Sequence, residues 1–369
     1  MSREQPLPSR TGEADHLHVD ALGVTVRIDL DGVPPADRVS IGEAWSGARH
    51  DEATLAAAIV SPRPRFLSDE TMSDLSTQVT LSALSARRGD LWLVHAGAIA
   101  DDDGRVVLFS GRSGMGKTTL MSSLARDYAY VSDESVGVAP DGSVLPYRKP
   151  LSIVDGAGRA KKQVSPRGLG LRDLPPTPLR LHAVVVLDRQ PRSTQAALEP
   201  LDIADAVAAI APQCSYLADL PRPLETLIGH VSAVGGALRL RYAEAADVLP
   251  LIRDLFAAPR PASREPIVSQ RAEATRGASG FTRTPVVDAV ALSGARLALL
   301  RRAPDDETTI HLVDGIGPVL WRAADGASFD DLVAAAVHAH GEPRGGDAGD
   351  AVRAALTALC DAGLIAERP

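Results

Sequence analysis

The chain has 369 residues, more than one domain of ordinary size, so two or three domains are expected. Hydrophobic residues make up 45% of the sequence and charged residues 23%, which excludes a largely disordered or a fibrous chain. The formal net charge is −8, and this argues against a broadly basic surface for nucleic acid or anionic lipid.

Cysteine usage and targeting signals limit the class of protein further. Cys214 and Cys360 are the only cysteines, so neither a disulfide framework nor a CxxC metal site can form. The polar N-terminus lacks the apolar core of a signal peptide, and no stretch reaches the roughly 18 apolar residues of a membrane span. We therefore expect a cytoplasmic protein with no membrane partner and no nucleic-acid partner.

The first 90 residues predict a tail followed by a β-rich lobe. We expect residues 1–16 to be disordered. Alternating apolar and polar residues over 16–30 indicate a half-buried strand. Apolar residues at helical spacing between Met72 and Leu84 predict a helix over 69–88.

A larger core is expected over residues 91–257. Apolar runs over 91–100 and 105–110, separated by turn residues, predict a hairpin of buried strands. We expect this core to end with a helix from about Ala243 to Phe256.

The remaining chain is expected to contain a linker and a small domain. Residues 258–280 are rich in Pro, Ala, Ser, Arg and Gly without apolar periodicity, which is typical of a linker. Residues 281–369 show short apolar strands and then two helical patterns. They predict a winged-helix-like α+β unit, and the whole chain is predicted to be a multidomain protein of mixed α+β and α/β class.

A complete GxxxxGK[ST] motif occupies residues 111–118, between a predicted strand and a predicted helix. Its glycines let backbone N–H groups converge on phosphate oxygens at the positive end of the helix. Lys117 would add positive charge at the β- and γ-phosphates, and the Thr118 hydroxyl would bind Mg²⁺. An incidental glycine-rich turn is the alternative, which the flanking strand and helix argue against. The residues expected to bind ATP are Gly111, Ser113, Gly114, Met115, Gly116, Lys117, Thr118 and Thr119.

Two acids and a histidine are the other candidate site residues. Asp133 and Glu134 follow the loop within a predicted strand, and Asp133 is a Walker B candidate. The pair is suited to hold Mg²⁺ together with Thr118, or to accept a proton from an attacking hydroxyl. Surface acids at a strand end are the alternative. His95 precedes the loop by one hairpin and is expected beside the γ-phosphate, although a lone histidine is more often structural.

These motifs, followed by Arg-Gly-Leu-Gly at residues 167–170, resemble the HPr kinase/phosphorylase family over about residues 91–255. The resemblance implies a P-loop kinase core related to phosphoenolpyruvate carboxykinase. It also implies that Asp133 is the catalytic acid/base, that His95 is its neighbour and that Arg167 acts from the signature loop.

The chain departs from that family at two positions. The family usually has paired aspartates where this chain has Asp133 and Glu134. It usually has a glutamate two residues before the signature arginine, where this chain has Ser165. The resemblance implies that this glutamate makes a second metal-binding contact, which Ser165 would not provide.

The C-terminal residues 281–369 resemble PqqD-like domains, which recognise the leaders of ribosomally made, modified peptides. Ser328 and Asp331 predict a capping box, and apolar residues give each predicted helix one apolar face. Trp321, at a predicted helix start, is more often a core residue than a ligand contact. The resemblance implies that a leader peptide adds a strand to an exposed sheet edge. A DNA-binding winged helix is the alternative, which the many acids of this unit argue against.

The combined expectation is an ATP- and Mg²⁺-dependent kinase of a peptide hydroxyl. The domain at 281–369 would hold the leader, and the linker would let the core peptide reach the active site. The alternatives are a kinase of a small hydroxyl metabolite and a non-enzymatic, ATP-gated peptide chaperone. The sequence leaves the oligomeric state open, with a homo-oligomer as one option.

Overall fold

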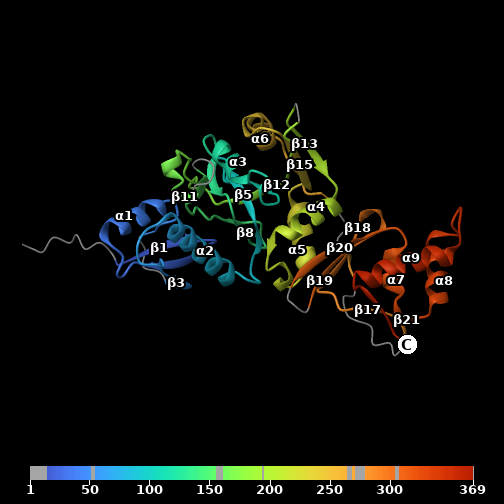
Figure 1. Cartoon of the computed structure of the whole chain (residues 1–369). Helices are drawn as coiled ribbons and strands as arrows, with labels where there is room; N and C mark the ends of the chain where they lie inside the picture. The colour runs from blue at the N-terminus through green and yellow to red at the C-terminus, as the bar shows by residue number, and fades with distance from the viewer. Residues whose placement is uncertain are drawn as a thin grey trace, which may run out of the picture.

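The computed structural model describes residues 15–50, 55–154, 161–192, 195–263, 268–270, 279–303 and 307–368. Of the tail expected over 1–16, residues 1–14 lie outside this range, and His16 is already part of a strand. The protein is a mixed α/β structure with several sheets. Figure 1 shows an N-terminal unit, a central unit and a C-terminal unit following one another along the molecule.

The N-terminal unit begins with a hairpin where the sequence pattern predicted a single strand. β1 (His16–Ala21) pairs antiparallel with β2 (Val24–Asp29). The chain reverses at Leu22 and Gly23, both with positive φ, a conformation that glycine adopts without a Cβ clash. Ala21 and Leu22 are consecutive apolar residues, so the alternation shifts by one position at the turn; this shift was the sequence signal of the hairpin. β3 (Ala58–Val60) pairs parallel with β2.

Two helices complete this unit, α1 (Pro35–Ala44) and α2 (Asp69–Ala86). The predicted helix over 69–88 is therefore confirmed, and the Ser68 side chain caps it by accepting from the Thr71 N–H. Both helices pack on the sheet through one apolar cluster that includes Ile28, Trp45 and Leu75.

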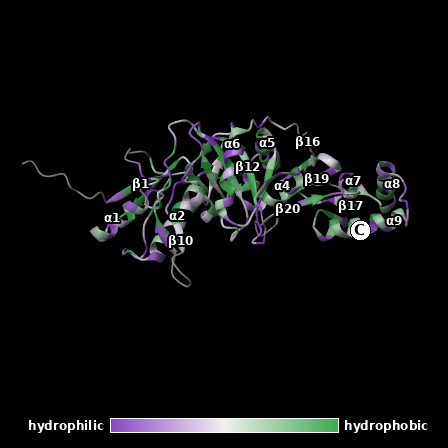
Figure 2. Ribbon diagram, turned by 90° about the horizontal axis from the view of Figure 1, so that it is seen from above, coloured by the Kyte–Doolittle hydropathy of each residue, from purple (hydrophilic) through white to green (hydrophobic). Residues whose placement is uncertain are grey.

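A six-stranded sheet forms the central unit. Its order is β13 (Ala197–Leu201), β15 (Ala237–Tyr242), β12 (Arg180–Arg189), β6 (Arg105–Ser110), β5 (Ala96–Ala100) and β7 (Ala129–Ser132). The three middle strands β15, β12 and β6 are parallel, and the predicted hairpin of β5 and β6 is confirmed. Figure 2 shows hydrophobic residues along β12. Such continuous apolar runs are typical of parallel strands buried on both faces.

Helices cover both faces of this sheet. On one face, Val107 and Phe109 pack with α3 (Lys117–Leu124) and α6 (Leu249–Ala257). On the other face, residues such as Val106 and Leu108 pack with α4 (Ile203–Ile210) and α5 (Pro223–Ala233). The helix expected from Ala243 is shorter, because a 3₁₀ turn over Ala245–Val248 comes before α6.

The apolar run over 91–100 is split between two sheets. β4 (Trp92–Val94) belongs to a four-stranded sheet with β14 (Cys214–Ser215), β8 (Val136–Val138) and β9 (Val144–Leu145). His95 is the break, and its N–H donates to the Gln213 carbonyl at 2.7 Å. A periodicity argument could not find this break, because both halves of the run are buried.

In its described residues, the C-terminal unit contains two sheets and three helices. One sheet has the order β16 (Val268–Ser269), β18 (Asp288–Leu292), β19 (Arg296–Arg302) and β20 (Thr308–Val313). The other has the order β21 (Asp325–Ala327), β17 (Gly280–Arg283) and β22 (Ile365–Arg368). The helices are α7 (Gly317–Ala323), α8 (Phe329–His340) and α9 (Ala348–Asp361).

Several local predictions for this unit are confirmed. The Ser328–Asp331 capping box begins α8, and Trp321 is a buried core residue of α7. Within the segment predicted to be a linker, β16 pairs with β18. The linker residues 264–267 and 271–278 lie outside the described residues.

The C-terminal unit packs directly against the central unit. Val290 and Leu300 belong to the same apolar cluster as the helices α4 and α5. Arg296 forms two hydrogen bonds with Asp202, at 2.7 and 2.8 Å. The contact is therefore both apolar and ionic.

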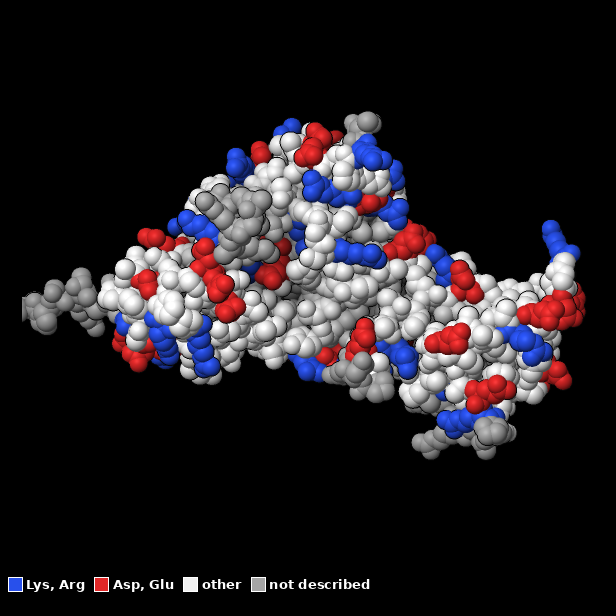
Figure 3. Space-filling view, viewed as in Figure 1, with Lys and Arg blue, Asp and Glu red and all other residues white. Residues whose placement is uncertain are grey.

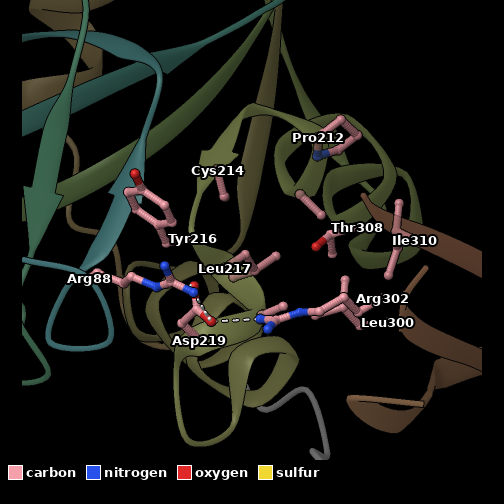
Figure 4. A pocket seen from close by; sticks show the side chains of 12 residues that line it. Arg88, Pro212, Cys214, Tyr216, Leu217, Asp219, Leu300, Arg302, Thr308 and Ile310 are labelled. Carbon is pink, nitrogen blue, oxygen red and sulfur yellow. Dashed lines mark hydrogen bonds and ion pairs between the residues drawn. The ribbon is translucent and has the colours of Figure 1, made fainter. Parts of the chain in front are cut away.

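A bridging ion pair lies at the same boundary. Figure 4 shows Arg88 and Arg302 meeting at Asp219, with closest distances of 2.9 and 2.6 Å. They line a cavity of about 230 Å³ between segments of the central and C-terminal units. One aspartate thus connects the end of the N-terminal unit with β19.

Charged residues of both signs are interspersed on the face shown in Figure 3. Within the described part of the chain, no helix has the length and apolarity needed to cross a membrane.

Candidate active site

The loop over residues 111–116 lies between β6 and α3, as the motif predicted. Gly114 and Gly116 have φ values of 84° and 82°, which favour glycine. Gly116 is also the N-cap of α3 and provides no side-chain cap. The first N–H groups of the helix therefore point toward the loop without a capping side chain, an arrangement suited to an anion.

Lys117 is the first residue of α3 and is only 7% exposed. Its Nζ donates to the Gly111 carbonyl at 2.6 Å and to the Arg112 carbonyl at 3.4 Å. Burial lowers its pKa, and the nearby Asp133 and Glu134 oppose that effect. The lysine thus folds back over the loop and faces the two acids.

Asp133 and Glu134 follow β7 directly, but they have different partners. Asp133 is 5% exposed and accepts a hydrogen bond of 2.8 Å from the Tyr130 hydroxyl. Glu134 has a side chain that is 38% exposed and lies 2.8 Å from the Lys149 ammonium. One acid is therefore held by a neutral donor and the other by a cation.

His95 lies at the break between β4 and β5 and is half-buried. Burial lowers its pKa, and the charge of Lys117 acts in the same direction, while Glu134 opposes both. The ordinary pKa of histidine is about 6.5, so His95 is mainly neutral at pH 7. A neutral imidazole can both donate and accept a hydrogen bond.

These groups line one cavity of about 530 Å³. Its residues are His95, Ser113, Gly114, Gly116, Lys117, Thr118, Thr119, Asp133, Glu134, Lys149, Ser152 and Arg189. Nine of the predicted site residues are therefore brought together. Gly111 and Met115 contribute carbonyl groups, which accept from Lys117 and from the Tyr242 hydroxyl respectively.

Arg167 is not among the residues that line the cavity. Its side chain is 66% exposed and pairs with Asp173 at 2.9 Å, and Arg148 pairs with the same carboxylate. The hydrogen bond from Arg167 lowers the pKa of Asp173, although partial burial opposes it. At the departure from the family pattern, the Ser165 hydroxyl accepts from the Gly168 N–H and caps the signature turn.

Three lining residues were missed by sequence reasoning: Lys149, Ser152 and Arg189. Arg189 ends β12, the parallel neighbour of β6. Because parallel strands present their carboxyl ends at one edge, the end of this apolar run was a usable signal. No motif in the sequence indicated Lys149 or Ser152.

The donor set is compatible with Mg²⁺. Thr118, Asp133 and Glu134 bring a hydroxyl and two carboxylates to the cavity, and Mg²⁺ prefers oxygen ligands. The described residues contain no group of three or more His, Cys, Asp or Glu that could hold a metal by themselves. Mg²⁺ in phosphoryl-transfer sites is usually held by one or two carboxylates and by substrate phosphates, which agrees with this set.

Comparisons with known proteins give little further information. No protein-family model matches the chain, and no curated protein sequence matches it. One solved structure to which it is similar is the Hpr(Ser) kinase/phosphatase from Coxiella burnetii, at 15% sequence identity and a TM-score of 0.25. That likeness covers 45% of this chain and 93% of the other. It is too weak to support an assignment of function.

Proposed function

We propose that the protein is an ATP- and Mg²⁺-dependent kinase that phosphorylates a hydroxyl group of a ribosomally made precursor peptide. The observation that carries this proposal is the single cavity in which the loop lysine, two acids and a histidine meet. A glycine-rich turn without this function would not need a buried acid, Asp133, opposite its lysine.

In this proposal, each residue of the cavity has its own role in phosphoryl transfer. Asp133 accepts the proton of the attacking hydroxyl, and Tyr130 fixes the direction of its carboxylate. The loop amides and Lys117 stabilise negative charge on the phosphates, the dominant requirement in phosphoryl transfer. Mg²⁺, held by Thr118 with the acids, would neutralise further phosphate charge when bound. His95, mainly neutral at pH 7, offers a hydrogen bond beside Asp133.

Arg167, the signature arginine, does not contact the cavity in this structure. Arg167 is held by Asp173, outside the residues that line the cavity. It would act on the transferring phosphoryl group only after leaving this partner.

The peptide part of the proposal is supported by the C-terminal unit. Among the described strands, β20 pairs only with β19 and is an edge strand. Beside it lies a groove of about 470 Å³ between β20 and α9. The groove has apolar lining from residues including Leu312 and Leu359, and Leu312 is exposed. An extended leader can add a strand at such an edge and place alternate side chains in the groove.

The packing of the C-terminal unit changes the expected role of the linker. Contacts such as Arg296 with Asp202 hold β19 against the central unit. The distance between the leader site and the cavity is therefore fixed. In the proposal, peptide residues beyond the leader span this separation, and the chain of residues 258–280 need not move.

The test is phosphoryl transfer by the full chain from ATP to short peptides encoded beside its gene, measured by mass spectrometry. Phosphopeptide formation supports the proposal, and Asp133→Asn should lower kcat by roughly 10²–10⁴. Leu312→Asp, which places a charge in the leader groove, should raise the peptide KM with little effect on kcat. Lys162→Ala, at an exposed position outside both sites, is the matched control.

Two other outcomes would contradict the proposal. A phosphorylated metabolite, with no peptide modified, would identify a small-molecule kinase. Peptide binding that depends on ATP, without any transfer, would identify a chaperone.

A further inference from the structure

Lys149 is a buried cation of the cavity that no sequence motif explains. Its side chain is 5% exposed, and Nζ lies 2.8 Å from Oε2 of Glu134 and 3.1 Å from the Pro150 carbonyl oxygen. It lines the cavity together with Lys117. Two of the four lysines of the chain therefore lie in one cavity.

We infer that Lys149 binds the γ-phosphate of ATP and that its ion pair with Glu134 is the resting arrangement that the nucleotide replaces. This inference rests on the proposed function, because it assigns a phosphate contact within the same cavity.

The two lysines reach the cavity from different directions. Lys117 comes from the start of α3 and folds back on the loop carbonyls. Lys149 comes from the segment between β9 and β10 (Leu151–Val154) and meets Glu134 at the end of β7. The loop lysine serves the β- and γ-phosphates. A second cation on the side of the acids therefore faces the terminal phosphate, next to the proposed base Asp133.

The chemistry of the ion pair favours exchange with a phosphate. An ammonium has three donors, and its two partners in the described part of the chain leave one for another acceptor. This ion pair is expected to contribute little net stability, because the buried Lys149 ammonium loses hydration while the 38% exposed Glu134 carboxylate keeps much of its contact with water. A phosphate of ATP offers more charge than one carboxylate, and charge-assisted hydrogen bonds to it are strong.

The exchange also leaves the Glu134 carboxylate available to bind Mg²⁺. When Lys149 turns to the γ-phosphate, the carboxylate can face the cation that accompanies ATP. Both Lys149 and Glu134 then keep an opposite charge beside them, so the exchange does not leave the buried Lys149 ammonium unpaired. ADP lacks the γ-phosphate and would leave the Lys149–Glu134 pair in place.

The experiment compares ATP with ADP binding by isothermal titration calorimetry, using the full chain with Mg²⁺. Loss of one charge-assisted hydrogen bond predicts that Lys149→Gln weakens ATP binding by about 10–100-fold and changes ADP binding by less than about 3-fold. Lys149→Arg retains the charge and should preserve part of the preference for ATP. Lys162→Gln removes an exposed lysine outside this cavity and should bind both nucleotides like the original chain.

A double variant separates phosphate binding from a structural role. If Lys149 only neutralises Glu134, then adding Lys149→Gln to Glu134→Gln should cost no ATP affinity beyond that of Glu134→Gln alone, and this would overturn the inference. An equal loss of ATP and ADP affinity in Lys149→Gln would overturn it as well. If the unchanged chain binds ATP and these variants bind it equally well, only the inference fails. If the unchanged chain binds neither nucleotide, the proposed function also fails.

Discussion

The Tyr130 hydroxyl donates a hydrogen bond of 2.8 Å to Oδ1 of Asp133, three residues further along the chain. The Tyr130 ring packs in the apolar cluster that also contains Leu120 and Leu124 of α3. The helix that follows the glycine loop is thus connected through one side chain to the acid opposite the loop. Burial, together with the charge of Asp133, raises the pKa of Tyr130 well above its ordinary value, so the hydroxyl stays a donor.

Tyr130→Phe should therefore affect catalysis more than nucleotide binding. The phenyl ring keeps the packing, but Asp133 loses the hydrogen bond that directs its carboxylate. We expect kcat for ADP release to fall by about 5–30-fold, with the KM for ATP almost unchanged. A rise in the KM for ATP as large as the fall in kcat would assign Tyr130 a purely structural role. A fall in thermal stability without a change in kcat would lead to the same conclusion.

Lys117→Ala should abolish most phosphoryl transfer without unfolding the protein. The ammonium contacts loop carbonyls, and its loss removes charge stabilisation of the transferred group. We expect kcat to fall by about 10²–10³, measured by ADP release, with the circular dichroism melting curve retained. Normal turnover in this variant would end the phosphate-loop interpretation.

His95 should contribute to the pH dependence of stability. Its pKa in the folded protein is lowered by burial first and by Lys117 second, so the unfolded chain binds a proton more readily. Stability from this group is therefore fully present above the ordinary pKa of about 6.5 and is lost as the pH falls below it. In denaturant titrations between pH 5 and pH 8, the free energy of unfolding of His95→Gln should fall less steeply with decreasing pH than that of the original chain.

The slope for His95→Gln should not vanish entirely. The buried His230 also has a pKa lowered by burial and should titrate in the same direction. Identical slopes for the two proteins would show that His95 is not linked to folding.

Asp288 provides a cap across the boundary between two units. Its Oδ2 accepts from the Leu224 N–H at 2.9 Å, in the first turn of α5, where the N-cap residue Arg222 has no side-chain cap. Asp288→Ala should cost about 0.5–2 kcal/mol of local stability. Asn retains an acceptor oxygen, so Asp288→Asn should lose less.

Hydrogen exchange at the Leu224 amide measures this contact directly. We expect faster exchange there in Asp288→Ala than in Asp288→Asn. Unchanged exchange in both variants would show that the C-terminal unit does not cap α5.

Local features of the structure were available from the sequence alone. The loop over 111–118 follows from contiguous residue types, as does the α8 capping box at Ser328 and Asp331. The helix over 69–86 follows from apolar spacing. Each of these features depends on residues close together in the chain, whose conformational preferences and hydrogen bonds act within one turn or one loop.

Only the tertiary structure decided which distant residues meet. The break of the strand at His95, the presence of Lys149 in the cavity and the pairing of Arg167 with Asp173 all depend on the strand order and the loop paths. The packing of the C-terminal unit on α4 and α5 likewise depends on apolar faces that match only in three dimensions. The burial of apolar surface is non-directional. The residue types therefore predict that an apolar face will be covered, but they do not identify the element that covers it.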